Sequence, residues 1–551
     1  VEKFTHQNVP GSQTCYTKEE DKAEIEVTQL PDVYMGMRIN NPVIRAYLTS
    51  ETDSTVSVRA EQYNKFGKLL NTDEGSVNIS GGSAVFEFDR VRNADSVKIY
   101  ADGEYIGGLN DTIEYENGIH LTEAPSDYQI YQRDDSNKAV ITFAGDVENN
   151  DGNITIHNDS IDVTFSEDQK DAVIVAAQYN SDGSLKSVDI KEKDGATTTM
   201  TSPTPYENVK VMVWDSLDNM NSIYESKTPD KITVSAVNKS TNETVSETVD
   251  AYDDFRADLS LDAGLYDIAL TYKGETINYE NVGVGDIWVA AGQSNMTDMG
   301  AITDGFDPET EDPIIDGMHI MYAEDTTWQK MSHPAGEGRF FKSGIRTSPV
   351  TSFAREIVQE ENVPVGIIQS SVGGTNIYQW ASGVKPGDAL DGYLLNALES
   401  CFDNMPSTDI KGILWYQGCN DAINEVYAYD YENLQNMIFT QMREFFGEDT
   451  PIITTQINDA NQDSTASLGY YDAWSYVKDV QRRNPELYDN VYVVGTSALD
   501  LGDTIHNSAK SNLSVGDAWA RTALNRVYGK TDVRYLHPTI DTATVKDSHT
   551  I

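Results

Sequence analysis

The first part of the chain alternates apolar and polar residues with a period of two. Clusters of Asn, Gly, Asp and Ser separate the alternating segments, as turns separate the strands of antiparallel sheets. Clear examples are VSVRAEQY at 56–63, SAVFEF at 83–88, SVKIYAD at 96–102, AVITF at 139–143 and AVIVAAQY at 172–179. This pattern predicts all-β modules of the Ig-like or sandwich type from residue 1 to about 285.

Two of these segments belong to an internal repeat. AEQYNKFGKL at 60–69 matches AAQYNSDGSL at 176–185 with a constant offset of 116 residues. In each copy a strand ends at Gln-Tyr-Asn, and Gly67 or Gly183 follows where a hairpin turn needs a positive φ. We therefore expect two copies of one β-module, at 1–125 and 126–227, and then a small β-sandwich segment at 228–285.

The pattern changes at Asp286, where continuous apolar runs begin to alternate with segments of helical periodicity. This alternation is typical of a parallel sheet covered by helices. The runs are IWVAAG at 287–292, MHIMYA at 318–323, VPVGIIQSS at 363–371, GILWYQG at 412–418, IITTQI at 452–457 and VYVVGTS at 491–497. We expect an α/β three-layer domain with a parallel sheet at 286–530 and a C-terminal tail at 531–551.

Composition supports a folded, multidomain protein with few anionic partners. The 551 residues are enough for three or four domains. Lys and Arg number 40 and Asp and Glu 89, so the net charge is −49, which argues against binding to nucleic acid or insertion into an anionic membrane. An apolar content of 39% with 30 tyrosines is too high for a disordered acidic tail.

The cysteines do not indicate a disulfide framework or a metal centre. Cys15, Cys401 and Cys419 are the three in the chain, and none lies in a metal-ligand spacing. The acidic, Asn-, Asp-, Ser- and Thr-rich composition favours a secreted or cell-surface bacterial protein over an acidic cytosolic one. The first residue is Val rather than Met, which we interpret as a sign of processing or trimming.

Polar groups with complementary chemistry follow four of the apolar runs. They are the hydroxyl of Ser294, the glycine turn at 372–375, the carboxamide of Asn420, and Asp503 three residues before His506. The carboxyl ends of parallel strands meet at one edge of a sheet, so these groups can meet there. A hydroxyl nucleophile, an oriented imidazole base and oxyanion donors are the groups that acyl transfer needs.

The motifs GDIWVAAGQSNM, IIQSSVGGTNIYQW and LWYQGCND, together with the Asp-x-x-His pair, resemble those of the SGNH hydrolases. Within that superfamily, with its flavodoxin-like fold, they look like the sialate O-acetylesterase-type carbohydrate acetylesterases. The resemblance covers about 286–530. One departure is Cys419-Asn420, where many relatives have Glu-Ser, so the contact made by that Glu is in doubt here.

The resemblance implies a role for each of these positions. Ser294 would be the nucleophile, His506 the base and Asp503 the residue that orients His506. The oxyanion hole would consist of the Ser294 and Gly374 (or Gly373) amides and the Asn420 side chain. Substrate contacts would come from Gln293, Gly373, Trp380 and Gln417. The mechanism would need neither a metal nor another cofactor.

Several alternatives remain open at the level of sequence. Ser294 could be a helix N-cap, and Ser370 and Ser371 are rival nucleophiles. A second Asp-x-x-His pair ends at His319, which we expect to be buried packing. His333 could be a loop residue that faces substrate, and Cys419 could be a packed residue rather than a thiol nucleophile. Tyr378 could stack on a sugar or belong to the core. The acidic segment 309–312 could be a solvated face or a calcium site.

We therefore expect a carbohydrate O-acetylesterase that removes acetyl groups from a glycan through a serine acyl-enzyme. Its partner would be the acetylated carbohydrate, and the β-modules could add glycan binding. The alternative is a glycan-binding or cell-surface adhesion protein whose hydrolase domain is inactive. Acetate release from an activated acetyl ester would discriminate between them.

Overall fold

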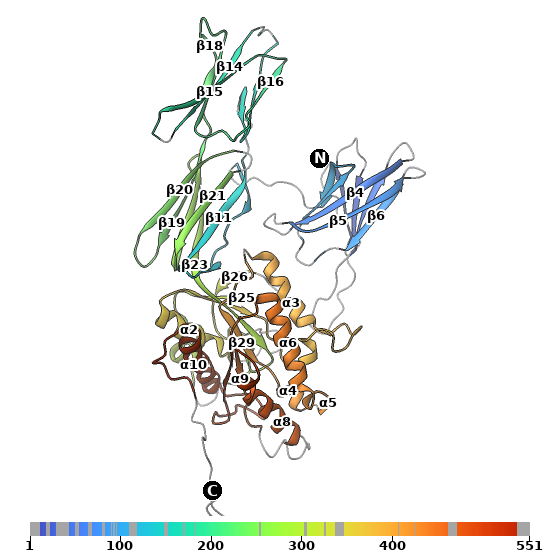
Figure 1. Cartoon of the computed structure of the whole chain (residues 1–551), viewed down its shortest axis with the longest axis vertical. Coiled ribbons are helices and arrows are strands. Elements are labelled where there is room, and N and C mark those ends of the chain that lie inside the picture. The colour runs from blue at the N-terminus through green and yellow to red at the C-terminus, as the bar shows by residue number, and fades with distance from the viewer. Residues whose placement is uncertain are drawn as a thin grey trace, which may run out of the picture. The chain divides into compact units, whose positions relative to one another are not determined.

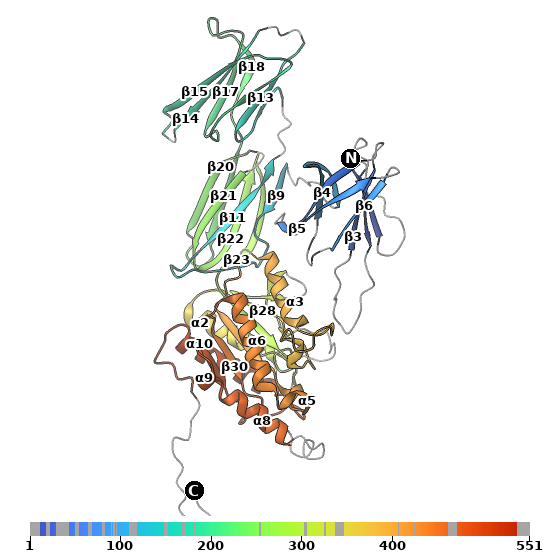
Figure 2. The same cartoon turned by 45° about the vertical axis from the view of Figure 1, so that its right-hand side comes forward.

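A computed structural model provides the structure of the chain (Figures 1 and 2). It divides into two compact units, one made of 1–126, 140–261 and 266–280 and the other of 127–139, 262–265 and 281–551. The structure describes residues 12–17, 23–28, 43–49, 54–63, 69–79, 83–89, 91, 94, 96–109, 118–147, 152–167, 169, 171–180, 182–252, 255–301, 306–323, 327–336, 346–405, 407–423, 425–460 and 471–536.

The first unit begins with a module of two antiparallel sheets. One sheet has the order β1-β2-β3-β6 and the other the order β5-β4-β7-β8. Their bounds are β1 Ser12–Thr17, β2 Ala23–Thr28, β3 Val43–Thr49, β4 Ser54–Tyr63, β5 Leu69–Ile79, β6 Ser83–Asp89, β7 Ser96–Ala101 and β8 Glu104–Leu109. Buried residues from both sheets, among them Ile44 and Val58, form one core cluster.

The next module also has two sheets with a common core. Their orders are β12-β13-β16 and β15-β14-β17-β18, and residues of both, such as Ile161 and Val211, share a core cluster. The bounds are β12 Ile154–Ile156, β13 Ser160–Thr164, β14 Val173–Tyr179, β15 Leu185–Glu192, β16 Thr197–Thr201, β17 Val209–Trp214 and β18 Ser222–Lys227.

The repeated sequence has the same local geometry in both modules. A register shift falls between Gln62 and Tyr63 in the pairing of β4 with β5, and between Gln178 and Tyr179 in the pairing of β14 with β15. Both glutamines are buried. Gly183 has a φ of +81°, as its turn requires, whereas Gly67 lies outside the described residues.

A third group of strands in the first unit combines segments far apart in the sequence. β9 (Ile119–Glu123) and β11 (Lys138–Val147) form a sheet with β21 (Phe255–Asp262), in the order β21-β11-β9. Four further strands are neighbours in a sheet in the order β20 (Thr244–Asp250), β19 (Lys231–Asn238), β22 (Gly264–Tyr272) and the first half of β23 (Glu275–Gly292). The division predicted at 125/126 separates β9 from β11 and β21, which pair with each other in this sheet. Pairing between segments so far apart leaves no local pattern in the sequence.

The second unit contains the sheet with parallel strands. From Asn281 onward β23 lies within it, and the strand order is β26-β25-β28-β23-β29-β30-β31. All neighbours are parallel except β26, which runs antiparallel to β25. The bounds are β25 Met318–Tyr322, β26 Trp328–Lys330, β28 Val365–Gln369, β29 Gly412–Tyr416, β30 Ile452–Thr455 and β31 Val491–Val494. The predicted run at 287–292 forms the end of β23, and each of the other five runs contains one parallel strand.

Helices cover both faces of this sheet. In Figure 1, α2 (Val350–Glu361) and α10 (Ala509–Arg526) lie on one side of β29, and α3 (Tyr393–Cys401) and α6 (Tyr431–Phe446) on the other. The predicted helix at 430–446 is thus present as α6. The remaining elements are α1 Pro308–Glu311, η1 Ile377–Gln379, η2 Phe402–Asn404, α4 Cys419–Ala422, α5 Glu425–Ala428, α8 Tyr471–Arg482, α9 Asn484–Leu487, and the pair β24 Gly300–Ala301 and β27 Arg346–Thr347. Within the described ranges, no helix combines the length and the apolar character that crossing a membrane would need.

A short upstream strand completes this unit. β10 (Ile130–Gln132) pairs in parallel with β23, and Arg133 makes two hydrogen bonds, of 2.9 and 2.8 Å, to the carboxylate of Asp286. Asp286 is fully buried and also accepts a hydrogen bond from the Tyr528 hydroxyl. A boundary at 286 would leave this carboxylate without its cation, so the second unit needs residues near 130 that lie outside the predicted segment 286–530.

Candidate active site

The loops after β23, β28, β29 and β31 place the candidate catalytic groups at one edge of the parallel sheet. β23 ends at Gly292, whose φ is +148° and whose substituted Cβ would lie 2.1 Å from the carbonyl oxygen of Tyr416. Only glycine fits this close approach to β29. The chain therefore turns sharply after the strand, and Ser294 follows in that turn.

Ser294, His506 and Asp503 form a continuous hydrogen-bonded chain. The Ser294 Oγ lies 2.9 Å from His506 Nε2, and His506 Nδ1 lies 2.7 Å from Asp503 Oδ2. The carboxylate can only accept, so the imidazole holds its proton on Nδ1, and Nε2 is left to accept the serine proton. This geometry is compatible with a hydroxyl nucleophile, an imidazole base and a carboxylate that orients the base.

The local backbone holds Asp503 in place and keeps it ionised. Its Oδ1 accepts the backbone N–H groups of Ile505 and His506, each at 2.9 Å. Burial by itself raises the pKa of Asp503. The two backbone donors and the His506 ring lower the pKa by more than burial raises it, so the pKa lies below its usual value. An ionised Asp503 at neutral pH is what an orienting acid requires.

Asn295 connects the turn that carries Ser294 to the loop that carries His506, a role that the sequence analysis did not assign. Its Nδ2 donates to the Ile505 carbonyl oxygen at 3.3 Å, and its Oδ1 accepts the Asn507 backbone N–H at 3.0 Å. Asn295 is fully buried. Asn295 lies within the segment GQSNM at 292–296. Its position next to Ser294 was the only feature of the sequence that could have indicated this role.

Free backbone donors lie beside Ser294. Within the described part of the chain, no acceptor hydrogen-bonds the backbone N–H of Ser294, Gly373 or Gly374. A Cβ at Gly373 would lie 3.8 Å from the Ser294 Cβ, so the glycine turn passes directly beside the nucleophile. Unengaged N–H groups in such a position suit a developing oxyanion.

Asn420 lies beside the same glycine turn, but its carboxamide nitrogen already has two partners. The Nδ2 donates to the Gly374 carbonyl oxygen at 3.0 Å and to Asn376 Oδ1 at 2.9 Å. An oxyanion would have to take over one of these two hydrogens. Gln293 fixes the backbone nearby, since its Oε1 accepts the N–H groups of Gly418 and Asn420 at 2.9 and 3.2 Å.

Three residues that we expected to touch substrate are interior instead. Trp380 is fully buried and packs edge-on against Trp415, with ring centroids 5.2 Å apart. Gln417 is fully buried and bonds to Asp421 and Tyr431, and Gln293 is only 2% exposed. These side chains support the loops of the site and are not exposed to a substrate in this conformation, so their direct contact with substrate stays a prediction. An aromatic or amide residue near a glycine turn has the same sequence pattern whether it contacts substrate or packs in the interior.

The rival nucleophiles and the rival base have other surroundings. Ser371 is fully buried and donates to Gln369 Oε1 at 3.0 Å. His319 is 1% exposed, and its Nδ1 donates to the Tyr128 carbonyl oxygen at 2.6 Å. Burial raises the pKa of the Cys419 thiol to about 12, which disfavours the thiolate that a nucleophile needs.

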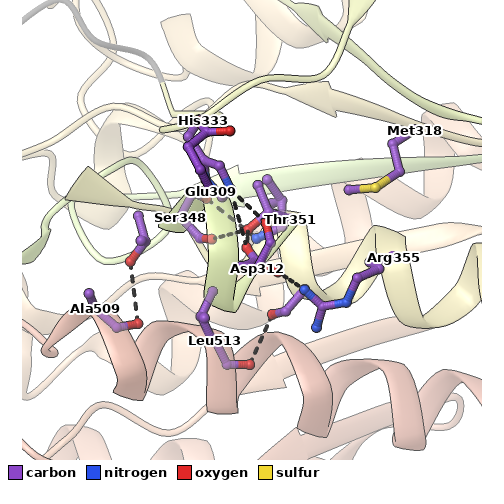
Figure 3. A network of polar contacts seen from close by, with 12 residues as sticks. Glu309, Asp312, Met318, His333, Ser348, Thr351, Arg355, Ala509 and Leu513 are labelled. Carbon is purple, nitrogen blue, oxygen red and sulfur yellow. Dashed lines mark hydrogen bonds and ion pairs between the residues drawn. The ribbon is translucent and has the colours of Figure 1, made fainter. Parts of the chain in front are cut away.

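Polar contacts around Asp312 form a network (Figure 3), and Ser348 connects it to the turn that carries Ser294. Arg355 and Thr351 both donate to the buried Asp312 carboxylate, and the His333 ring donates to its backbone carbonyl at 2.7 Å. Ser348 continues the network, because its hydroxyl donates to the Met296 carbonyl oxygen at 2.8 Å. The His333 side chain is 2% exposed and so does not face substrate. No group of three metal-ligating side chains occurs among the residues that the structure describes.

Comparison with known proteins adds an independent finding. Residues 284–525 match the family model described as a carbohydrate esterase, sialic acid-specific acetylesterase. The human protein sialate O-acetylesterase is 29% identical over 178 residues, which are 26% of this chain and 32% of that protein. The chain therefore spans about a third of the length of this curated relative.

Solved structures are similar at lower identity. A carbohydrate acetylesterase from Xanthomonas citri is 21% identical with a TM-score of 0.40, covering 61% of this chain and 74% of that chain. A protein from Arabidopsis thaliana is 20% identical with a TM-score of 0.37, covering 44% of this chain and 98% of that chain. Residues 284–525 are thus similar to the sialic acid-specific acetylesterase family of carbohydrate esterases.

Proposed function

We propose that the chain is a carbohydrate O-acetylesterase that hydrolyses acetyl esters on a glycan. The observation that carries this proposal is the unbroken hydrogen-bonded chain from the Ser294 Oγ through both nitrogens of His506 to Asp503. The free N–H groups beside Ser294 and the family match support the same function. We further propose an SGNH-type three-layer fold for the catalytic unit, a location outside the cell, and glycan binding by the β-modules.

In the first half of the proposed reaction, the Ser294 Oγ attacks the acetyl carbonyl carbon while His506 Nε2 takes the hydroxyl proton. The Asp503 carboxylate stabilises the imidazolium that forms. Negative charge on the carbonyl oxygen is met by the N–H groups of Ser294 and Gly374 and by the Asn420 carboxamide. The intermediate then expels the sugar oxygen, which receives the proton from His506, and leaves an acetyl group on Ser294.

In the second half, water takes the place of the sugar. His506 removes a proton from the water molecule as the oxygen attacks the acetyl-serine carbonyl, and the same donors hold the oxyanion. Collapse releases acetic acid and returns the proton to the Ser294 Oγ. Each half-reaction uses the same groups, so loss of one group slows both.

The test is acetate release by the full chain from a panel of acetylated xylan, mannan, pectin and sialic acid. The full chain is needed because the Asp286 carboxylate depends on Arg133. Wild type should release acetate from at least one member, and the Ser294→Ala variant from none. No release from any member or from p-nitrophenyl acetate would refute the proposal and favour the inactive, glycan-binding alternative.

A further inference from the structure

The side-chain amide of Asn420 could face the reacting ester with either its nitrogen or its oxygen. Only the nitrogen can donate to an oxyanion, and the oxygen would repel it. The Nδ2 now donates one hydrogen to Asn376 Oδ1 and the other to the Gly374 carbonyl oxygen. The orientation of Asn420 therefore depends on which atom Asn376 presents to it.

The orientation of Asn376 is in turn tied to Asp421. The Asn376 Nδ2 lies 3.4 Å from Asp421 Oδ1, and the same oxygen accepts the Ile377 backbone N–H at 3.0 Å. An ionised carboxylate has no hydrogen to donate, so it draws the NH2 end of Asn376 toward itself. The oxygen end of Asn376 is then left for Asn420.

Asp421 is fixed and shielded from solvent. It is fully buried, and its Oδ2 accepts a hydrogen bond from Gln417, whose own oxygen accepts the Tyr431 hydroxyl at 2.8 Å. The titratable groups that face it are Cys419 and Tyr431, and burial raises the pKa of both so that they stay neutral in acid. Burial likewise raises the pKa of Asp421 to about 6.

From this arrangement we propose that Asp421 is a positioning residue that sets, through Asn376, which end of the Asn420 carboxamide faces the acetyl ester. The inference rests on the proposed function. When Asp421 is ionised, the donor chain runs from Asn420 to Asn376 to Asp421 and presents an N–H at the oxyanion hole. When Asp421 is protonated, it can donate to the oxygen of Asn376, and both amides are free to turn over.

Exposure decides which hydrogen of Asn420 the oxyanion takes. Asn376 is 9% exposed, so its Oδ1 would lose its partner without water to replace it. Gly374 is exposed, and water can solvate its carbonyl when the bond from Asn420 is released. The hydrogen now on the Gly374 carbonyl is therefore the one that the oxyanion takes, while Asn376 keeps the other.

The experiment is the pH dependence of kcat for p-nitrophenyl acetate hydrolysis by the full chain, with circular dichroism at each pH to confirm folding. Full activity of the wild type needs both His506 and Asp421 deprotonated, so log kcat should fall with a slope steeper than one, approaching two, over the pH range in which Asp421 becomes protonated. Asp421→Asn removes one of them. We expect a slope of about one and a kcat about ten- to a hundredfold lower at neutral pH, with KM nearly unchanged.

Two further variants complete the design. Asn376→Ala cuts the link while leaving Asp421 in place, so it should also give a slope of about one and a lower kcat; it carries the test if Asp421→Asn does not fold. Asp517→Asn is the matched control, because burial also raises the pKa of Asp517. This residue lies on α10, near Arg355 of α2. This control should keep the wild-type slope.

Two outcomes overturn the inference: a folded Asp421→Asn or Asn376→Ala variant that keeps the wild-type slope, or a variant whose loss lies in KM alone. Failure of the proposed function looks different. In that case the wild type releases no acetate, or Ser294→Ala remains active, whatever residue 421 is.

Discussion

The stability of the catalytic unit should depend on pH through His319, the histidine that rivals His506 in sequence pattern. Burial lowers the pKa of His319 to about 4, and the hydrogen bond that it donates to the Tyr128 carbonyl only partly offsets this. Its nearest acidic neighbour in sequence, Asp316, lies 3.9 Å from Lys330 instead. His319 therefore stays neutral in the folded protein until the solution is strongly acidic.

The sign and size of the effect follow from the two pKa values. An unfolded histidine takes up its proton near pH 6.5, whereas folded His319 does so near pH 4, so the contribution is complete above 6.5 and is lost as the pH falls toward 4. Between pH 7 and pH 5 the free energy of unfolding should fall by about 2 kcal/mol from this group alone. The raised pKa of Asp421 acts in the opposite direction, so variants must be compared at both pH values.

The assay is urea unfolding of the full chain followed by tryptophan fluorescence. Of the seven tryptophans all except Trp214 lie in the second unit, so the signal reports mainly on the catalytic unit. His319→Gln should reduce the difference in unfolding free energy between pH 7 and pH 5 by about 2 kcal/mol, while turnover at pH 7 stays within about threefold of wild type. His157→Gln, in the first unit, is the control and should change neither quantity.

Two results would refute this reasoning. One is an unchanged pH dependence of stability in a folded His319→Gln variant, which would mean that the ring is not held neutral. The other is a loss of turnover as large as that of His506→Gln, which would make His319 the base. The second result would also overturn the assignment of Asp503.

Three further predictions concern single residues. Asp503→Asn should lower kcat by about a thousand- to ten-thousandfold in steady-state acetate release, because His506 loses the acceptor that fixes its tautomer; a loss below tenfold would contradict this role. Asn420→Ala should lower kcat about a hundredfold with KM nearly unchanged, and a pure KM effect would make Asn420 a substrate contact. Arg133→Leu should destabilise the second unit by about 3 to 5 kcal/mol in urea unfolding, because Asp286 is left buried without its cation; an unchanged midpoint would contradict this.

The sequence indicated the candidate triad because parallel strands impose a simple rule on position. Ser294 and the glycine turn both follow apolar runs that became neighbouring strands, so their loops had to meet. Short spacing did the same for Asp503 and His506, which lie three residues apart on one loop. Patterns within one segment or one turn were therefore sufficient for this part of the site.

Interactions between distant segments could not be predicted in this way. Arg133 and Asp286 are 153 residues apart, and neither has a neighbour that signals the pair. The side-chain direction of Trp380 was also out of reach, because an aromatic residue after a glycine turn packs inward or outward according to its partner, here Trp415. The order of the amides at Asn376 and Asn420 depends on the two loops after β28 and β29 together and has no pattern in either of them.

The central claim is that Ser294 carries the acetyl group during turnover, and intact-mass and peptide mass spectrometry of the full chain test it directly. Wild type quenched in acid during hydrolysis of p-nitrophenyl acetate should carry one added acetyl group, located on the peptide that contains Ser294. The Ser294→Ala variant should show no such adduct and should lose at least about a thousandfold in kcat while keeping its fold. An acetyl group on Ser371 or Cys419, or turnover by Ser294→Ala within tenfold of wild type, would contradict the claim.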